Sequence, residues 1–275
     1  MADIKLILSD IDGTILNDKN VVDSDLKENI VKLNHRKIPF ILASARSPRG
    51  MITLAKELGV MDNPIACYNG ALVVKDLQDS DYTTILSHGL NLLEVKQIFQ
   101  ILQKKFPEIS INLYSGADWY VENLDKWVKI EADITNMTPI ATDLNQLVDK
   151  LEIPIHKLLL IGESSEISKA MKYLQNVNLE NSSFYLSKDN YLEITASRVS
   201  KEHVLRELAD YYHIKLNNTM TLGDNFNDVP MLNLAEVGVA MDNAPVDVKT
   251  HANFVTKSNN ENGVSYAIEK YVLKR

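Results

Sequence analysis

The feature that constrains the fold most is an alternation of short apolar runs with helical patterns over residues 4–67. Residues 4–9 form an apolar run of strand length, and residues 24–35 place apolar side chains at helical spacing. The alternation continues with a strand, a helix and a strand at residues 38–43, 48–58 and 65–67. Strands that alternate with helices at this spacing predict a parallel sheet with helices on both faces.

The middle of the chain follows a different pattern, which predicts an inserted α+β segment. Within it, residues 109–114 and 119–121 predict a hairpin. The earlier alternation returns with a helix at about 201–212 and strands at 219–222, 237–240 and 254–255. We therefore expect a discontinuous α/β domain, residues 1–81 and 190–275, that carries a second domain, residues 82–189.

Composition and charge narrow the class of protein. The chain has 275 residues, 45% of them apolar and 24% charged, which suits one large core or two modest ones. Its net charge of -8 argues against nucleic acid as a partner, because binding a phosphate backbone requires a basic surface. A small phosphorylated ligand stays compatible with this charge, since a local cationic pocket can lie on an acidic protein.

Two further features concern the cellular compartment. Cys67 is the only cysteine, so no intrachain disulfide can form. We find no secretory signal pattern and no apolar run long enough to cross a bilayer. We therefore expect a cytoplasmic, soluble protein with no membrane partner. The sequence leaves the oligomeric state open, with a monomer favoured.

The most specific motif comes directly after the first predicted strand and reads Asp10-Ile11-Asp12-Gly13-Thr14. In open α/β sheets, ligands bind beyond the carboxyl ends of the strands, and two carboxylates two residues apart can both face that crevice. Gly13 allows the backbone to approach a ligand closely. A surface turn rich in aspartate is the alternative, and we favour the functional interpretation.

A second acidic motif follows another predicted strand and reads Gly223-Asp224-Asn225-Phe226-Asn227-Asp228. It places two acids and two amides at a strand-to-helix junction, and hard oxygen ligands of this kind suit Mg²⁺. An aspartate N-cap with polar neighbours is the alternative. Because two acidic motifs follow two strands, we favour a shared function over chance.

Two weaker candidates lie at the ends of other elements. Ser44-Ala45-Arg46 ends the second predicted strand, where a hydroxyl and a cation suit phosphate oxygens. A helix start explains the same residues equally well. Lys201 begins a predicted helix, and on its own it is typical of a solvated helix lysine. Neither segment assigns a function without the two acidic motifs.

Taken in chain order, these four segments resemble those of the haloacid dehalogenase-like phosphatase superfamily. Residues 10–14 match its nucleophile loop and residues 223–228 its acidic metal loop, while Ser44 matches its Ser/Thr position and Lys201 its lysine. Asn69-Gly70-Ala71 and the place of the insertion resemble the Cof-type subfamily, which carries a large α/β cap.

The sequence departs from the family pattern at two places. Ser44-Ala45-Arg46 stands where Thr-Gly-Arg is more usual, and Glu202 follows the lysine where glycine is common. Serine keeps the hydroxyl, so we expect activity to survive.

The resemblance implies a Rossmann-like parallel-sheet core with an inserted α+β cap domain. It also implies that Asp10 is the nucleophile of a phosphatase that forms an aspartyl-phosphate. Asp12 would protonate the leaving oxygen and then activate water. Lys201 would help to offset the repulsion between the attacking carboxylate and the phosphate.

The same resemblance implies a Mg²⁺ site and a phosphate site. Asp10, Asp224 and the backbone carbonyl of Asp12 would bind Mg²⁺, with Asp228 orienting the metal shell or a ligand water. The residues expected at the phosphate or the substrate are Ser44, Asn227 and the backbone after Asp10, including Gly13, together with Ala45 and Arg46.

The sequence thus predicts a Mg²⁺-dependent phosphatase that acts on a small phosphorylated metabolite such as a sugar phosphate. A phosphomutase of the same superfamily is one alternative, because it also begins with an aspartyl-phosphate. A binding module without catalysis is another, although it would be expected to lose an acid of the site. We expect the cap to set specificity, and the hairpin of Tyr114, Asp118, Trp119 and Tyr120 is a candidate contact surface that equally suits the core of the hairpin.

Overall fold

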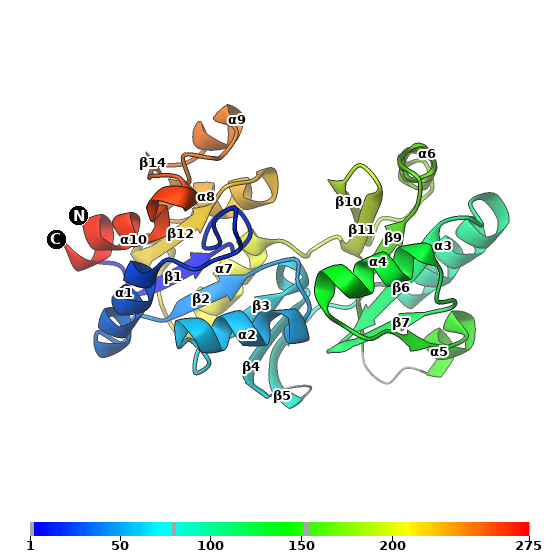
Figure 1. Ribbon diagram of the computed structural model, residues 1–275, viewed down its shortest axis with the longest axis horizontal. Helices are drawn as coiled ribbons and strands as arrows, with labels where there is room; N and C mark the ends of the chain where they lie inside the picture. The colour runs from blue at the N-terminus through cyan, green and yellow to red at the C-terminus, as the bar shows by residue number, and fades with distance from the viewer. Residues whose placement is uncertain (1–2, 79–80, 151–153, 275) are drawn as a thin grey trace. The chain divides into compact units, whose positions relative to one another are not determined.

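The computed structural model describes residues 3–78, 81–150 and 154–274, which form two compact units. The first unit contains the described residues of Met1–Ala45, Met51–Ile85 and Ser200–Arg275. The second contains those of Arg46–Gly50 and Leu86–Val199. Figure 1 shows the chain passing from blue through green to red, so that its two ends contribute to the same unit.

The first unit is built on an eight-stranded sheet in the order β14-β13-β12-β1-β2-β3-β4-β5 (Figure 1). Neighbouring strands from β14 to β3 are parallel, and β4 runs antiparallel to β3. The parallel strands therefore end at one common edge. The bounds are β1 (Leu6–Ser9), β2 (Phe40–Ala43), β3 (Ile65–Cys67), β4 (Leu72–Gln78), β5 (Asp81–Ser87), β12 (Thr219–Gly223), β13 (Val237–Ala240) and β14 (Phe254–Val255).

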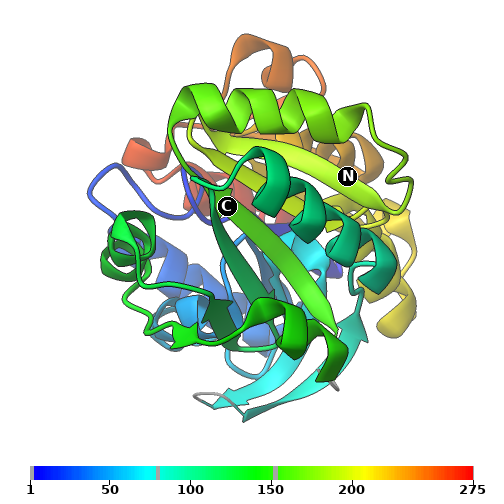
Figure 2. The same ribbon diagram turned by 90° about the vertical axis from the view of Figure 1, so that its right-hand side faces the viewer.

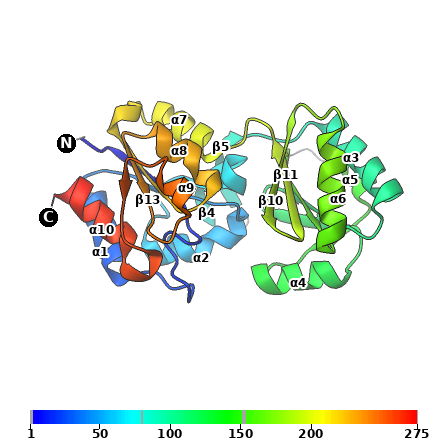
Figure 3. The same cartoon turned by 90° about the horizontal axis from the view of Figure 1, so that it is seen from above.

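Helices cover both faces of this sheet, with α1, α2 and α10 on one side and α7 and α8 on the other (Figure 3). In α1, the Asp23 carboxylate caps the helix by accepting hydrogen bonds from the amides of Asp25 and Leu26. Leu26, Ile30 and Leu33 form its buried stripe. The bounds are α1 (Ser24–His35), α2 (Pro48–Leu58), α7 (Lys201–Tyr211), α8 (Val229–Leu234), α9 (Val246–Lys249) and α10 (Gly263–Ile268).

The second unit has its own six-stranded sheet in the order β10-β11-β9-β6-β7-β8. All neighbouring strands in it are antiparallel except β7 and β8, which are parallel. The bounds are β6 (Ser110–Ser115), β7 (Asp118–Val121), β8 (Ile140–Ala141), β9 (Ile155–Ile161), β10 (Ser182–Lys188) and β11 (Tyr191–Ala196).

Three helices, α3, α5 and α6, pack on one face of this second sheet (Figure 2). Their apolar side chains share one core with those of the strands; Phe99 of α3, Val148 of α5 and Ile167 of α6 belong to it. The fourth helix, α4, contacts β6. The bounds are α3 (Leu92–Lys105), α4 (Lys126–Thr135), α5 (Leu144–Lys150) and α6 (Ser164–Gln175).

The predicted fold class is confirmed, since the first unit has a parallel-rich sheet between helices. One strand differs from the prediction: β5 (Asp81–Ser87) pairs into the first sheet, whereas the sequence placed it at the start of the insertion. The predicted inserted domain, residues 82–189, begins four residues and ends ten residues before the corresponding stretch of the second unit, Leu86–Val199. The division into catalytic core and cap stays a prediction. Among the described residues, no helix combines the length and the apolar character that a membrane span needs.

Candidate active site

Asp10 lies where β1 ends, beside the end of β12. The two strands pair in parallel with Ser9 opposite Leu222, and the Asp10 amide donates to the Leu222 carbonyl at 2.9 Å. Asp224 therefore follows one strand at the place where Asp10 follows the other. Asp10 is 7% exposed, so its carboxylate is almost fully withdrawn from water. The structure brings the two acidic motifs together, although 210 residues of sequence separate Thr14 from Asp224.

Lys201 joins these motifs from the first turn of α7. Its ammonium nitrogen lies 2.5 Å from Asp10 Oδ1 and 2.6 Å from Asp228 Oδ1, and its side chain is 1% exposed. Ser200 caps the helix by accepting from the amide of His203, which fixes the start of α7 at this position. Without its context this residue was typical of a solvated lysine, whereas the family resemblance implied a role at Asp10. The structure buries it between two carboxylates.

Asp228 organises the second acidic loop with both of its carboxylate oxygens. Oδ2 accepts hydrogen bonds from the amides of Asp224 and Asn225, each at 3.0 Å, and Oδ1 accepts from Lys201. Asp228 is 0% exposed, and a Cβ added at Gly223 would clash with its side chain. Glycine is therefore required where the strand passes so close to this carboxylate.

Gly13 and Thr14 bring the first loop against Asp224. Thr14 Oγ1 donates to Asp224 Oδ1 at 2.8 Å. Gly13 has a φ of +81° and a Cβ there would clash with the Asp224 carboxylate. Asp12 precedes Gly13 on the same loop, and its side chain is exposed. The sequence assigned Gly13 to close approach by a ligand, whereas its close neighbour in the structure is a carboxylate.

The donor set fits a divalent cation. Asp10, Asp224 and Asp228 each offer a carboxylate oxygen, and these oxygens lie within 4.8 Å of one another. Three carboxylates and the single ammonium of Lys201 leave two negative charges. Mg²⁺ would balance them, and it prefers oxygen ligands of this kind. Because both Asp228 oxygens already accept hydrogen bonds, Asp10 and Asp224 are the better placed direct ligands.

Burial and the neighbouring charges together shift the pKa values of Asp10, Asp224 and Lys201. Burial raises the pKa of Asp10 well above its usual value, although the Lys201 ammonium opposes the shift. Burial also raises the pKa of Asp224. For Lys201, burial alone would lower the pKa, but the charges of Asp10 and Asp228 outweigh it and raise the pKa. Without further positive charge, Asp10 and Asp224 are thus driven towards protonation, which a bound cation would oppose.

The residues predicted at the phosphate do not all join this cluster. Ser44 is buried just after β2, which is the neighbour of β1 in the sheet. Asn227 Nδ2 donates to Asn69 Oδ1 at 3.4 Å, so it ties the metal loop to the turn after β3. Ala45 ends one stretch of the first unit, and Arg46 opens the short segment 46–50 that is grouped with the second.

The hairpin of β6 and β7 is packed rather than open. Tyr114 and Trp119 are 2% and 1% exposed, and their rings stack with centroids 5.9 Å apart. Trp119 Nε1 donates to Asn112 Oδ1 at 3.0 Å. Of the two interpretations that the sequence left open, these contacts favour the structural one for both aromatic side chains.

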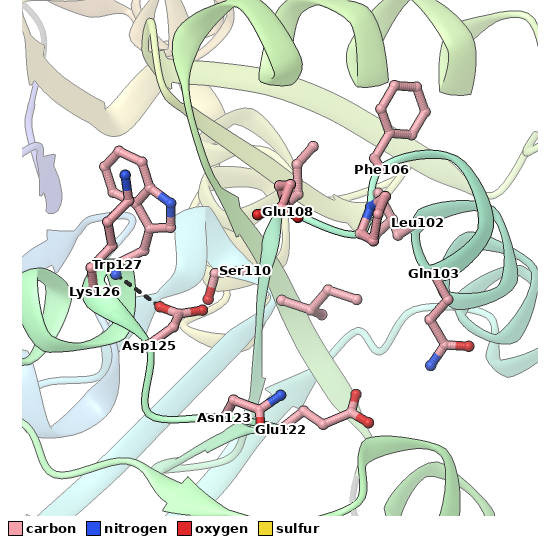
Figure 4. Close-up of a pocket in the computed structure, with 13 residues that line it drawn as sticks. Leu102, Gln103, Phe106, Glu108, Ser110, Glu122, Asn123, Asp125, Lys126 and Trp127 are labelled. Atoms are coloured by element: carbon pink, nitrogen blue, oxygen red, sulfur yellow. Dashed lines mark hydrogen bonds between the residues drawn. The ribbon is translucent and has the colours of Figure 1, made fainter.

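A cavity of about 450 Å³ in the second unit is a separate feature (Figure 4). Phe106, Glu108, Ser110 and Trp127 line it, and the Asp125 carboxylate there accepts the hydrogen bond that caps α4. Among the residues that the structure describes around it, none belongs to the predicted chemistry. Volume alone therefore does not mark the site.

Two residues with contacts in the cluster were not given roles from the sequence. Thr14 stood inside the first motif, but nothing in its spacing pointed to Asp224. Asn69 stood in the Asn69-Gly70-Ala71 segment that served only to recognise the subfamily, and it accepts the hydrogen bond from Asn227. Both contacts join loops far apart in sequence, which a local pattern does not record.

Comparison with known proteins gives one consistent result. The sequence profile described as haloacid dehalogenase-like hydrolase matches residues 7–268. A candidate phosphatase from Haemophilus influenzae is 30% identical over 267 residues, covering 97% of each chain. A haloacid dehalogenase-like hydrolase from Bacteroides thetaiotaomicron has a TM-score of 0.86 at 28% identity, over 97% of this chain and 99% of that one. A Thermotoga maritima structure has the same TM-score at 29% identity, over 97% of both chains.

Proposed function

Because the chain belongs to the haloacid dehalogenase-like hydrolase family, we propose that it is a Mg²⁺-dependent phosphatase that hydrolyses small phosphate monoesters through an aspartyl-phosphate. The family predicted from the four motifs is confirmed by the match over residues 7–268. The observation that carries the proposal is the burial of Lys201 between Asp10 and Asp228, inside a group of three carboxylates. Burying a lysine beside a cluster of carboxylates that could bind a metal costs free energy of folding, and such an arrangement is typical of a catalytic centre.

In the first step, a carboxylate oxygen of Asp10 attacks phosphorus and the bond to the leaving oxygen breaks. Asp12 donates its proton to that oxygen, so the alcohol leaves neutral. In the second step, Asp12 takes a proton from water, the resulting hydroxide attacks phosphorus, and Asp10 is released with inorganic phosphate. The exposed position of Asp12, two residues from the buried nucleophile, suits a group that must meet both the leaving oxygen and water.

Lys201 holds Asp10 by one oxygen and supplies fixed positive charge at the reacting carboxylate. A carboxylate that approaches a phosphate dianion meets a repulsion of about 4 kcal/mol per charge pair at 4 Å and an effective dielectric of 20. Mg²⁺, when bound by Asp10, Asp224 and the Asp12 carbonyl, would supply the remaining charge that offsets this repulsion. Asp228 then acts by holding Lys201 and the loop amides in place.

The proposed substrates are small sugar phosphates or similar metabolites. We extend to this chain the phosphatase activity in the name of its Haemophilus influenzae relative, and we propose the second unit as the cap that selects the substrate. Ser44 and Asn227 are proposed phosphate contacts, with Arg46 as a further one. A phosphomutase remains the second candidate, because the first step would be the same and only the acceptor would differ.

The test is phosphate release from a panel of phosphorylated metabolites by the pure protein, with and without chelation of divalent cations. We expect release that Mg²⁺ restores after chelation and that Asp10→Asn abolishes while the circular dichroism spectrum is unchanged. Full activity after exhaustive chelation, or near-normal release by Asp10→Asn, would contradict the proposal. Isomerised sugar phosphate in place of free phosphate would identify the mutase.

A further inference from the structure

The loop that follows Asp10 leaves two of its carbonyl groups to be bound from outside the loop. Within the loop, the amides of Thr14, Ile15 and Leu16 all donate to one acceptor, the Ile11 carbonyl, at 2.9–3.2 Å. The carbonyls of Gly13 and Leu16 instead accept hydrogen bonds from side chains elsewhere in the first unit. Their donors therefore help to fix how these two peptide groups are oriented.

The two donors are asparagine amides from neighbouring loops. Asn243 Nδ2 donates to the Gly13 carbonyl at 2.8 Å, and Asn259 Nδ2 donates to the Leu16 carbonyl at 3.1 Å. Asn243 follows β13 and Asn259 follows β14, so both stand at the sheet edge where β1 and β12 also end. Neither residue belongs to the motifs that predicted the chemistry.

The two asparagines are also bonded to each other and to the far end of the loop. The backbone amide of Asn259 donates to Asn243 Oδ1 at 2.9 Å. Asn259 Nδ2 also donates to Asp18 Oδ1 at 3.2 Å, and Asn260 Nδ2 donates to Asp18 Oδ2 at 2.9 Å. Asn259 is 7% exposed, so water competes little for its contacts. The chain of amides thus holds the loop at three points: Gly13, Leu16 and Asp18.

The point of contact nearest to the chemistry is the peptide group between Gly13 and Thr14. On one side Thr14 Oγ1 bonds Asp224, and on the other the Asn243 amide bonds the Gly13 carbonyl. Gly13 has a φ of +81°, which glycine adopts readily. The Thr14 amide of this peptide donates to the Ile11 carbonyl at 3.2 Å, so the bond from Asn243 is the second one that fixes its orientation. Asp12 is the preceding residue, and the direction of its exposed side chain depends on this backbone.

We propose that Asn243 and Asn259 are positioning residues that hold the nucleophile loop so that Asp12 meets the leaving oxygen. This inference rests on the proposed function for the role of Asp12, but the bracing of the loop does not depend on it. Neither asparagine touches the reacting atoms in this assignment. Loss of either side-chain amide should leave Asp10 and Lys201 in place and impair proton transfer from Asp12 to the leaving oxygen.

The experiment uses Asn243→Ala, Asn243→Asp and Asn259→Ala in the full chain, with Asn63→Ala as the matched control. Asn63 Nδ2 donates to the Phe40 carbonyl at 3.1 Å in the same unit and has no bond to the loop. For each protein, kcat/KM is measured on p-nitrophenyl phosphate, whose leaving group needs little protonation, and on an alkyl phosphate, whose leaving group needs it. Hydrogen exchange of peptides that cover residues 11–22 is measured in parallel.

We expect faster hydrogen exchange over residues 11–22 in all three variants and an unchanged rate in the control. We expect kcat/KM for the alkyl phosphate to fall about tenfold, the equivalent of about 1.4 kcal/mol, with a fall of less than about threefold for the aryl ester. Asn243→Asp keeps the acceptor for the Asn259 amide but not the donor to Gly13, so it should behave as Asn243→Ala does.

Unchanged exchange would overturn the bracing, whatever the activity. Faster exchange with equal losses on both esters would overturn the role in positioning Asp12, because a merely structural effect does not distinguish the leaving groups. If the wild-type protein hydrolyses neither ester and no member of the metabolite panel, the proposed function fails, and the exchange result still decides whether the asparagines hold the loop.

Discussion

Replacing Lys201 with methionine separates burial from distance as the source of an ion pair's strength. Lys201 lies 2.5 and 2.6 Å from Asp10 and Asp228 and has a side chain that is 1% exposed. Lys27 and Glu57 in the same unit are 2.9 Å apart, but each side chain is 42% exposed. Lys201 thus makes two buried contacts, whereas Lys27 makes one exposed contact of similar length.

The expected cost follows from what the methionine leaves behind. At 2.5–2.6 Å and an effective dielectric of 20, the Coulomb energy of each Lys201 contact is about 6.5 kcal/mol. Much of that sum offsets the cost of burying the ammonium. Removing the ammonium, however, leaves two buried carboxylates without a positive partner. Removing one partner of a buried pair costs about 3–5 kcal/mol. The exposed Lys27–Glu57 pair should be worth less than about 1 kcal/mol.

The assay is urea unfolding of the chelated protein, followed by far-ultraviolet circular dichroism. Tryptophan fluorescence serves as an independent signal, because both tryptophans, Trp119 and Trp127, lie in the second unit. We expect Lys201→Met to lower the free energy of unfolding of the first unit by about 3–5 kcal/mol at pH 8, with the tryptophan transition unmoved. This loss of stability should be smaller at pH 5.5. Burial already raises the pKa of Asp10, so its protonation at lower pH removes one of the two unpaired buried charges. If Lys201→Met costs no more than Lys27→Met, the reasoning is refuted.

Two further predictions follow from single contacts. Gly13→Ala should abolish turnover and weaken Mg²⁺ binding, measured by calorimetry, because the added Cβ would displace the Asp224 carboxylate and because alanine disfavours the φ of +81° at this position. Normal activity in this variant would contradict the prediction. The second unit should lose about 3 kcal/mol of stability as the pH falls from about 7.5 to 4, because burial lowers the pKa of His156 to about 4 while the unfolded state takes up a proton near 6.5. Protonation would also oppose the hydrogen bond that His156 Nδ1 accepts from the Gly116 amide at 3.0 Å. Tryptophan fluorescence in urea at several pH values checks this, and a His156→Gln protein with the same pH dependence would refute it.

Local patterns were enough to predict most of the regular elements. The α1 helix begins and ends where the sequence predicted, at Ser24 and His35, because its apolar stripe and its polar start both depend on residues that are close together in the sequence. The strands before Asp10 and Asp224 were predicted for the same reason. The motifs at their ends then followed from the rule that parallel strands end at one edge.

What the sequence did not predict depends on pairing between distant segments. β5 has an ordinary strand pattern, but only its neighbour in the sheet decides that it joins β4 rather than the second sheet. For Lys201, the residue pattern alone was typical of a solvated lysine, and only the family resemblance placed it at the reacting carboxylate of Asp10. Asn243 and Asn259 are ordinary polar loop residues in the sequence. Their contacts with Gly13 and Leu16 exist only because β13 pairs with β12 and β14 pairs with β13.

The order of strands in the first sheet also sets an order of events while the chain is being synthesised. The central strand β1 has one neighbour, β2, within about 35 residues and its other neighbour, β12, more than 200 residues later. At about 5–20 residues per second, the open edge of β1 waits on the order of 10–40 s for its partner to leave the ribosome. The six-stranded sheet, by contrast, needs only residues 110–196 and can close first. We therefore expect nascent chains that end before residue 219 to expose one edge of β1, a strand that is apolar except for Ser9, when the second unit is already complete. Such chains should depend on chaperones during that interval.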